Sequence, residues 1–248
     1  MNTKFNLPRF LVNPAEIGNE SIVLTKENYH KAIRVLRLKA GNNLIILNNL
    51  YKEYLCYIKF IEKNKIICEI LNCKEHATPV LKLILAQSVI KKTGMEILIQ
   101  KATELGVSEI YPLITRRTVA GKDTSCDRWK LIAKEAVLQS ERPVIPLIHP
   151  IQSLNQFLSD LPIVDLYILC MERETLPIKN ILRDKERSLP FTTGGILILC
   201  GPEGGFVEDE KKFILEKGFK SVSLGQNILR AETAGIVTIS IINYETGM

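Results

Sequence analysis

The sequence predicts an α/β protein in which a mostly parallel sheet follows a small β-rich unit. Short apolar runs such as 196–200 lack a polar alternate face, which is typical of strands buried on both sides. From residue 81 onward such runs alternate with segments of helical periodicity, and this alternation favours a parallel sheet. Residues 1–75 instead show strand patterns and one helix. We therefore predict two domains, residues 1–75 and 76–248.

The N-terminal domain is expected to hold one helix over residues 27–37, with Thr25 as its N-cap. Asn48 and Asn49 predict a turn, because asparagine tolerates positive φ. Residues 72–80 are interpreted as the linker to the second domain. The expected strands of this domain cover residues 21–24, 44–47, 51–61 and 65–71. The third of them is expected to place on one side Tyr54, Cys56, Ile58 and Phe60.

The C-terminal domain is expected to alternate strands and helices up to a final helix that begins at Ala231. The expected strands cover residues 81–87, 109–114, 145–148, 165–170, 196–200 and 222–224. A first helix is expected to end at Gly106 and to bury Met95, Leu98, Ile99, Ala102 and Leu105. A second, capped by Asp127, is expected to bury Trp129, Ile132, Ala133, Ala136 and Val137. Further helices are expected over 152–158 and from Glu208 to Gly218, and a loop over 182–194.

Two polar loops follow buried strands directly, at residues 201–205 (GPEGG) and 225–230 (GQNILR). In open α/β sheets ligands bind outside the carboxyl ends of the strands, where both loops belong. The spacing matches neither a P-loop nor G-x-G-x-x-G, so a phosphate cradle is disfavoured. An adenosine-like ligand held by backbone groups between apolar walls such as Leu224 and Ile228 fits better. The alternative is a pair of ordinary turns.

The formal net charge of +6 is unevenly spread. Residues 1–78 carry 12 Lys or Arg and 7 Asp or Glu, whereas residues 143–248 carry 10 and 13. This distribution suits a polyanion bound by the first half and a small molecule bound by the second, although a solvated surface alone would also produce it. We expect a cytoplasmic protein without membrane spans, because no apolar run approaches about 20 residues. The six cysteines are expected to be free thiols, and no metal site is expected.

The segments GPEGG and LGQNILRAETA, at residues 201–205 and 224–234, resemble the two signature segments of the RsmE family. The resemblance covers nearly the whole chain. It implies a SPOUT methyltransferase domain with a trefoil knot and helices on both faces of the sheet, preceded by a PUA-like barrel. It also implies S-adenosylmethionine as methyl donor, N3 of a uridine in small-subunit rRNA or the 30S particle as the target, and a homodimer. The chain departs from the family at Asn48-Asn49, where members often carry Asp-Gly.

The resemblance also implies roles for individual residues. Arginine can stabilise a uridine anion, and a carboxylate can accept its proton or orient the arginine. The catalytic candidates are Arg230, Arg142, Glu203 and Glu232. The expected cofactor contacts are Leu169, Cys170, Met171, Glu172, Cys200, Gly201, Glu203, Gly204, Gly205, Leu224, Gly225, Asn227, Ile228, Leu229 and Thr233. The expected RNA contacts are Arg9, Arg34, Arg37, Lys92, Arg116 and Arg117.

Other interpretations stay open on the residues alone. The same enzyme class acting on a different RNA site is one, and a non-catalytic RNA-binding protein with structural glycine loops is another. A Rossmann-type nucleotide enzyme is opposed by the missing G-x-G-x-x-G. An arginine beside a carboxylate is also an ordinary salt bridge, so the catalytic candidates need the geometry of the site.

Overall fold

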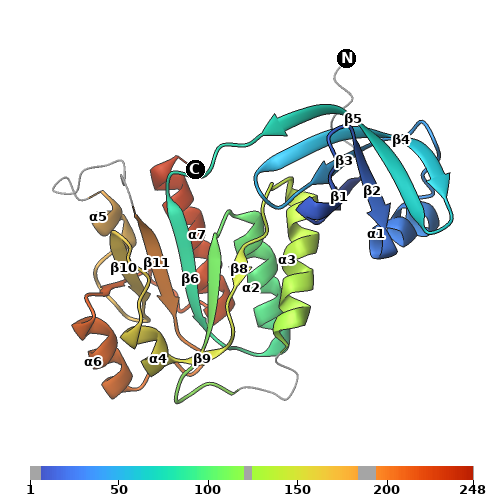
Figure 1. The fold of residues 1–248 in the computed structure, drawn as a ribbon. Coiled ribbons are helices and arrows are strands. Elements are labelled where there is room, and N and C mark those ends of the chain that lie inside the picture. The colour runs from blue at the N-terminus through green and yellow to red at the C-terminus, as the bar shows by residue number, and fades with distance from the viewer. Residues whose placement is uncertain (1–6, 120–124, 184–193, 248) are drawn as a thin grey trace. The chain divides into compact units, whose positions relative to one another are not determined.

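The computed structural model describes residues 7–119, 125–183 and 194–247 (Figure 1). The chain divides into two compact units, and each has its own sheet. Unit 1 comprises residues 1–78 and 137–145, and unit 2 comprises residues 79–136 and 146–248.

Unit 1 is built on a mixed sheet with strand order β1-β3-β4-β5-β2. Its strands are β1 (Arg9–Leu11), β2 (Ser21–Thr25), β3 (Asn43–Leu47), β4 (Lys52–Glu62) and β5 (Lys65–Glu75). Only β1 and β3 pair in parallel; the other pairs are antiparallel. A 3-10 turn (Pro14–Glu16), α1 (Lys26–His30) and a π-helical turn (Lys31–Val35) complete the unit. The core includes Phe10, Ile22, Leu24, Leu44, Ile46, Cys56 and Ile58.

The expected elements of unit 1 are present, with corrections that have physical causes. Strand β5 continues into the predicted linker, because its residues 72–75 pair with the start of β4. Phe60 is 54% exposed, since the register shifts between Ile58 and Phe60 and turns the side chain outward. Thr25 stands at the N-cap, but its hydroxyl donates to Glu16 Oε1 (3.2 Å) and does not cap the helix. The Asn48-Asn49 turn is confirmed, with φ of 58° at Asn49.

Unit 2 contains a sheet in which all strand pairs are parallel, as predicted. The strand order is β12-β10-β11-β6-β7-β8, and β9 also pairs with β7. The strands are β6 (Lys82–Ser88), β7 (Glu109–Ile114), β8 (Leu147–Ile148), β9 (Gln152–Ser153), β10 (Leu166–Cys170), β11 (Gly195–Cys200) and β12 (Lys220–Val222). Threading of the C-terminal segment through a knot stays a prediction, because strand order does not report it.

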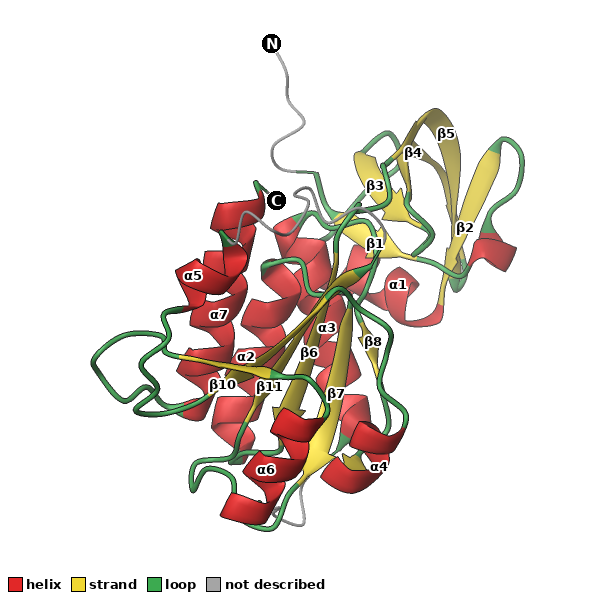
Figure 2. Ribbon diagram, turned by 90° about the vertical axis from the view of Figure 1, so that its left-hand side faces the viewer, coloured by secondary structure: helices red, strands yellow, loops and turns green. Residues whose placement is uncertain are grey.

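Helices cover both faces of this sheet (Figure 2). They are α2 (Lys92–Glu104), α3 (Cys126–Ser140), α4 (Leu154–Ser159), α5 (Ile178–Leu182), α6 (Glu208–Glu216) and α7 (Ala231–Thr246). On one face, α4 and α6 pack Phe157 and Ile214 against Ile84 and Leu197. On the other face α2 and α7 pack together, because Gly235 of α7 lets Leu98 of α2 approach closely. The central strands are thus buried on both sides, which explains their continuous apolar runs.

The ends of several elements differ from the sequence prediction. Helix α2 begins at Lys92 and takes Gly94 into its first turn, ahead of the first buried residue that the sequence assigns to it, Met95. Helix α3 begins at Cys126, so the preceding Ser125, whose Oγ accepts from Arg128 N (3.4 Å), occupies the place assigned to Asp127. Strand β12 ends at Val222, two residues early. Helix α5 was not predicted, and residues 184–193 of the expected 182–194 loop lie outside the described residues.

Within the described ranges no helix is long and apolar enough to cross a membrane. No group of three or more potential metal ligands gathers among residues 7–119, 125–183 and 194–247. All six cysteines are free thiols, in agreement with the sequence prediction.

A charged cluster lies at the amino-terminal edge of the unit 2 sheet, around Glu109 at the start of β7. The Glu109 carboxylate forms an ion pair with Lys82 and accepts from Tyr111 (2.9 Å), and it lies 2.8 Å from His149 Nε2. The His149 ring stacks on Tyr111, with centroids 3.7 Å apart. Burial raises the pKa of Glu109, but these partners outweigh it and hold the pKa below its ordinary value.

Replacing Glu109 by glutamine is expected to destabilise the protein by about 1–2 kcal/mol at pH 7, because three partners lose an anionic acceptor. A depressed pKa contributes stability above the unfolded pKa of about 4.3, and this is lost as pH falls through the lower folded value. The difference in free energy of unfolding between the parent protein and Glu109→Gln should therefore become smaller at acidic pH. Urea unfolding at pH 7 and pH 3.5 measures it. Glu104→Gln, which removes only the partner of Lys101, is the matched control.

Candidate functional site

The site is the edge of the unit 2 sheet formed by the carboxyl ends of its strands. Because neighbouring strands are parallel, the loops after β6, β7, β10, β11 and β12 all emerge at this edge. Cys170, Cys200 and Gln87 stand in one row across β10, β11 and β6. The three loops predicted to bind the cofactor begin directly beyond or beside this row.

The loop after β11, residues 201–205, is held from neighbouring segments by three hydrogen bonds. Gln87 Nε2 donates to the Gly201 carbonyl (3.1 Å), and Lys91 N donates to Glu203 Oε1 (3.0 Å). Arg117 Nη1 donates to the Gly204 carbonyl (2.8 Å). These contacts connect the loop to β6, to the start of α2 and to the loop after β7.

The loops after β10 and β12 are tied to each other through their backbones. Ser223 N donates to the Leu176 carbonyl (2.8 Å), and Ile178 N donates to the Ser223 carbonyl (3.2 Å). Gly225 then turns the second loop with φ of 133°, a conformation that a residue with a Cβ rarely adopts. These two loops therefore act as one structural unit.

The predicted cofactor contacts surround these loops. Cys200 and Leu169 are buried at the strand ends, whereas Gly225 and Asn227 are exposed and Ile228 is 60% exposed. A Cβ built on Gly205 or Gly225 would meet nothing within 4 Å. Open backbone beside exposed apolar side chains suits a ligand with a flat apolar base and polar edges, and S-adenosylmethionine has this chemistry.

Gly204 differs from Gly205 and Gly225. Its φ is not positive, and a Cβ there would only meet the aliphatic part of Arg117 at 3.4 Å. The sequence predicts Gly204 as a cofactor contact, and this stays a prediction; Gly205 (φ 67°) and Gly225 are the loop positions at which the backbone requires glycine.

The catalytic candidates of unit 2 lie at the starts of two helices. Arg230 is the exposed N-cap residue of α7, and Glu232 stands in the first turn of that helix. The Glu232 carboxylate lies 3.3 Å from where a Cβ of Gly94 would be, in the first turn of α2. Glu203 also lies at the start of α2, because its carboxylate accepts a hydrogen bond from Lys91 N. Both carboxylates are therefore near the amino-terminal end of α2, where the helix dipole is positive. This arrangement favours positioning roles for Glu203 and Glu232 over proton transfer.

Arg142 belongs to unit 1, so the structure does not bring it together with Arg230 within one unit. Its backbone N–H donates to the Val137 carbonyl (3.2 Å) just beyond the end of α3. Burial lowers the pKa of its guanidinium from the ordinary value. Its catalytic role stays a prediction.

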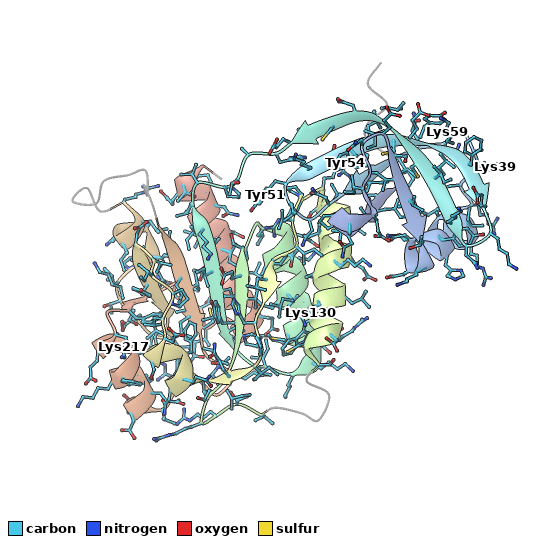
Figure 3. The ribbon with its side chains drawn as sticks, in the orientation of Figure 1. Lys39, Tyr51, Tyr54, Lys59, Lys130 and Lys217 are labelled. Atoms are coloured by element: carbon cyan, nitrogen blue, oxygen red, sulfur yellow. The ribbon has the colours of Figure 1, made fainter. Side chains whose placement is uncertain are left out.

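The expected RNA contacts of unit 1 fall into two groups. Arg34 and Arg37 are exposed on the helical segment and just after it, and Lys39 and Lys59 also project outward (Figure 3). Arg9 is only 9% exposed in its side chain and pairs with Glu53 (3.0 Å) and Glu141 (2.9 Å). Arg9 is thus engaged in holding unit 1 together, and its contact with RNA stays a prediction.

The expected RNA contacts of unit 2 are Lys92, Arg116 and Arg117, all exposed. Arg116 is anchored at both ends, because its N–H donates to Glu210 Oε1 (2.8 Å) and its guanidinium pairs with Asp209 (3.1 Å). Arg117 is already committed to the Gly204 carbonyl. The basic loop after β7 therefore contacts both α6 and the glycine loop, and its contact with RNA stays a prediction.

Sequence reasoning missed a buried polar network under the loops. Thr238 donates its hydroxyl hydrogen to the Ala234 carbonyl (2.8 Å), so the Cys170 thiol, 3.1 Å from Thr238 Oγ1, acts as donor to it. The hydrogen bond between Cys170 and Cys200, together with burial, raises the pKa of the Cys200 thiol. Gln87 extends this row on β6. The sequence signal that could have indicated this network is the polar residue Gln87 at the end of an otherwise apolar strand.

Comparison with known proteins gives matches over both units. The family of RNA methyltransferase domains matches residues 76–243, and the family of RNA methyltransferase PUA domains matches residues 24–71. The chain is 34% identical to ribosomal RNA small subunit methyltransferase E of Rickettsia conorii, covering 96% of this chain and 94% of the relative. It is 30% identical to the protein of the same name from Bacillus subtilis, covering 90% of each.

Solved structures agree with these matches. A ribosomal RNA small subunit methyltransferase E from Neisseria gonorrhoeae, bound to S-adenosyl methionine, superposes with a TM-score of 0.84 at 27% identity, covering 96% of this chain and 98% of that one. A methyltransferase from Legionella pneumophila in complex with the same cofactor gives a TM-score of 0.84 at 28% identity, with the same coverage.

Proposed function

Because the chain belongs to the RsmE family of RNA methyltransferases, we propose that it methylates N3 of a uridine in small-subunit ribosomal RNA with S-adenosylmethionine as methyl donor. The observation that supports this most directly is the group of loops at the strand ends, of which one is held by three hydrogen bonds and two are joined through their backbones, on a chain that superposes on cofactor-bound relatives. The cofactor supplies an electrophilic methyl group on a sulfonium.

We propose that the loops at 169–172, 200–205 and 224–229, with Thr233, hold the methyl donor. Gly205 and Gly225 leave backbone open to it, and Leu224, Ile228 and Leu229 provide apolar contact. This assignment keeps all the cofactor contacts predicted from the sequence. In this assignment the positive φ angles that require glycine are at Gly205 and Gly225, and not at Gly204.

Arg230 is the proposed catalytic residue. N3 lies on the Watson–Crick edge of uracil, so the base must be unpaired or flipped out to react. Loss of the N3 proton leaves an anion spread over N3 and two carbonyl oxygens, and a guanidinium stabilises such an anion by charge and by hydrogen bonds. Arg230 is exposed at the start of α7, so its side chain is open to a substrate. Arg142 is kept as a second candidate for the same role.

We propose that residues 1–75 bind RNA and that residues 76–248 carry out methyl transfer, and that the active protein is a homodimer. Support for the dimer comes from α7, where Ile236, Val237 and Ile241 are only half-buried and Tyr244 is 82% exposed. A helix that is apolar on several sides favours a partner on the uncovered side.

Mass mapping of small-subunit rRNA from a strain that lacks this protein tests the proposed function. Loss of one methyl group on a uridine, restored by the purified protein with S-adenosylmethionine, is the expected result. Loss of a methyl group from a different RNA would keep the enzyme class and replace the substrate. An unchanged methylation pattern together with no cofactor binding would leave only the RNA-binding interpretation.

Replacing Arg34 and Arg37 together by alanine is expected to weaken RNA binding for all sequences alike, because phosphate contacts carry no sequence information. The slope of log affinity against log salt concentration should flatten by roughly 0.7–0.9 for each lost contact. Titration of an rRNA fragment at several salt concentrations measures this. Lys59→Ala is the matched control, since Lys59 is already paired with Glu69 (2.7 Å). An unchanged slope in the double variant would remove this surface from the proposal.

A further inference from the structure

We infer that Gln87 is a positioning residue for the methyl donor, because its carboxamide anchors the first residue of the loop 201–205. The inference rests on the proposed function, since it assigns a role toward the cofactor that this loop is proposed to bind. Gln87 itself is fully buried and acts through the loop.

Both hydrogens of the Gln87 amide are used. Nε2 donates to the Ser88 carbonyl (2.9 Å) on its own strand and to the Gly201 carbonyl (3.1 Å) just past the end of β11. The peptide that joins Gly201 to Pro202 has no N–H, so this carbonyl is its only hydrogen-bonding group. Within the part of the chain that the structure describes, Gln87 is the residue that donates to the carbonyl of the peptide that opens the loop.

Gln87 is an unfavourable residue for the stability of the fold, which indicates that it has a functional role. Gln87 Oε1 is buried and has no hydrogen-bond partner among the described residues, and it lies 3.6 Å from where a Cβ of Gly235 would be. A buried unpaired polar atom is unfavourable. The same face of β6 carries Leu83 and Leu85, so an apolar residue would suit stability alone. Local departures from the favourable choice are expected at functional sites.

The three ties on the loop differ in their exposure. The contacts of Glu203 and Gly204 come from an exposed carboxylate and the exposed Arg117, where water competes for the same groups. The contact from Gln87 comes from a side chain with no exposed surface. The hydrogen bond from Gln87 therefore holds the start of the loop at Gly201, and the other two hydrogen bonds hold Glu203 and Gly204 in its middle.

The test is the substitution Gln87→Met, which keeps length and volume and removes both donated hydrogen bonds. The dissociation constant for S-adenosylmethionine, measured by calorimetry, should rise roughly tenfold, the scale of one lost hydrogen bond. The KM for the cofactor should rise with it, while kcat stays within about threefold, because the uridine-side groups are untouched. Gln87→Asn, whose amide is too short to reach Gly201, should raise the dissociation constant to the same extent as Gln87→Met.

Ile84→Val is the control, a buried substitution on the same strand at the end away from the loops, and it should leave cofactor affinity unchanged. If the parent protein binds the cofactor and Gln87→Met binds it equally well, the inference is overturned and the proposed function survives. If the parent does not bind the cofactor, the proposed function itself fails. If neither Gln87 variant folds, Gln87 maintains the fold rather than the donor loop, which also overturns the inference.

Discussion

Replacing Arg230 by alanine is expected to slow methyl transfer by about 10²-fold or more, with cofactor affinity within about threefold of the parent protein. The magnitude is that of losing one charge-stabilising donor in an active site. Arg230 is the N-cap residue of α7 and makes no side-chain cap hydrogen bond, so the fold does not depend on its guanidinium. The loss should therefore appear in the chemical step.

Single-turnover methylation of a small-subunit particle, with enzyme in excess, measures that step directly. Arg128→Ala is the matched control, because Arg128 is another exposed arginine of unit 2 and pairs with Glu96 on α2 (3.4 Å). Arg230→Lys keeps the charge without the planar fork and should recover only part of the rate. A rate for Arg230→Ala equal to that of the control would transfer the catalytic role to Arg142.

Replacing Gly225 by valine is expected to weaken binding of S-adenosylmethionine by about 10- to 100-fold. A β-branched residue at φ 133° costs on the order of 1–3 kcal/mol, and the loop must change conformation to relieve it. Since this loop is tied through Ser223 to the loop after β10, both would shift together.

Gly218→Val is the matched control for Gly225→Val. Gly218 has φ of 88° at the end of α6, so its substitution is also strained, but it lies away from the three loops. Calorimetric titration of both variants, at a temperature where each is folded, separates strain in general from strain at the site. Equal affinities for the two variants would contradict the assignment of Gly225 to the donor site. Gly204→Val should have a smaller effect, because that position accepts a Cβ.

The sequence predicted the parallel sheet, its helices other than α5, and both glycine loops, because these depend on local patterns. An apolar run such as 196–200 with a following GPEGG specifies a buried strand and a tight loop without reference to distant residues. Gly106 and Gly218 ended their helices as expected, because a left-handed φ at that position strongly favours glycine.

Features that depend on distant partners were not predicted. The ion pairs of Arg9 with Glu53 and Glu141 join residues that are far apart in the sequence. The short strand β1 acquires its identity only by pairing with β3. Gln87 is a single polar residue whose meaning comes from a carbonyl 114 positions away in the chain. Contacts of this kind cannot be predicted from local sequence patterns, because they form only when the fold brings distant residues together.

The buried thiol of Cys200 supplies an intrinsic probe of the final helix. Cys200 is 1% exposed beneath α7, and its raised pKa keeps it as the unreactive thiol while that helix is in place. A thiol reagent can modify Cys200 only after α7 detaches, so the labelling rate reports the free energy of that local opening. The exposed Cys73 would react at once and serve as the internal reference. A methyl donor bound at the proposed loops, which include Cys200, would slow the first reaction and leave the second unchanged.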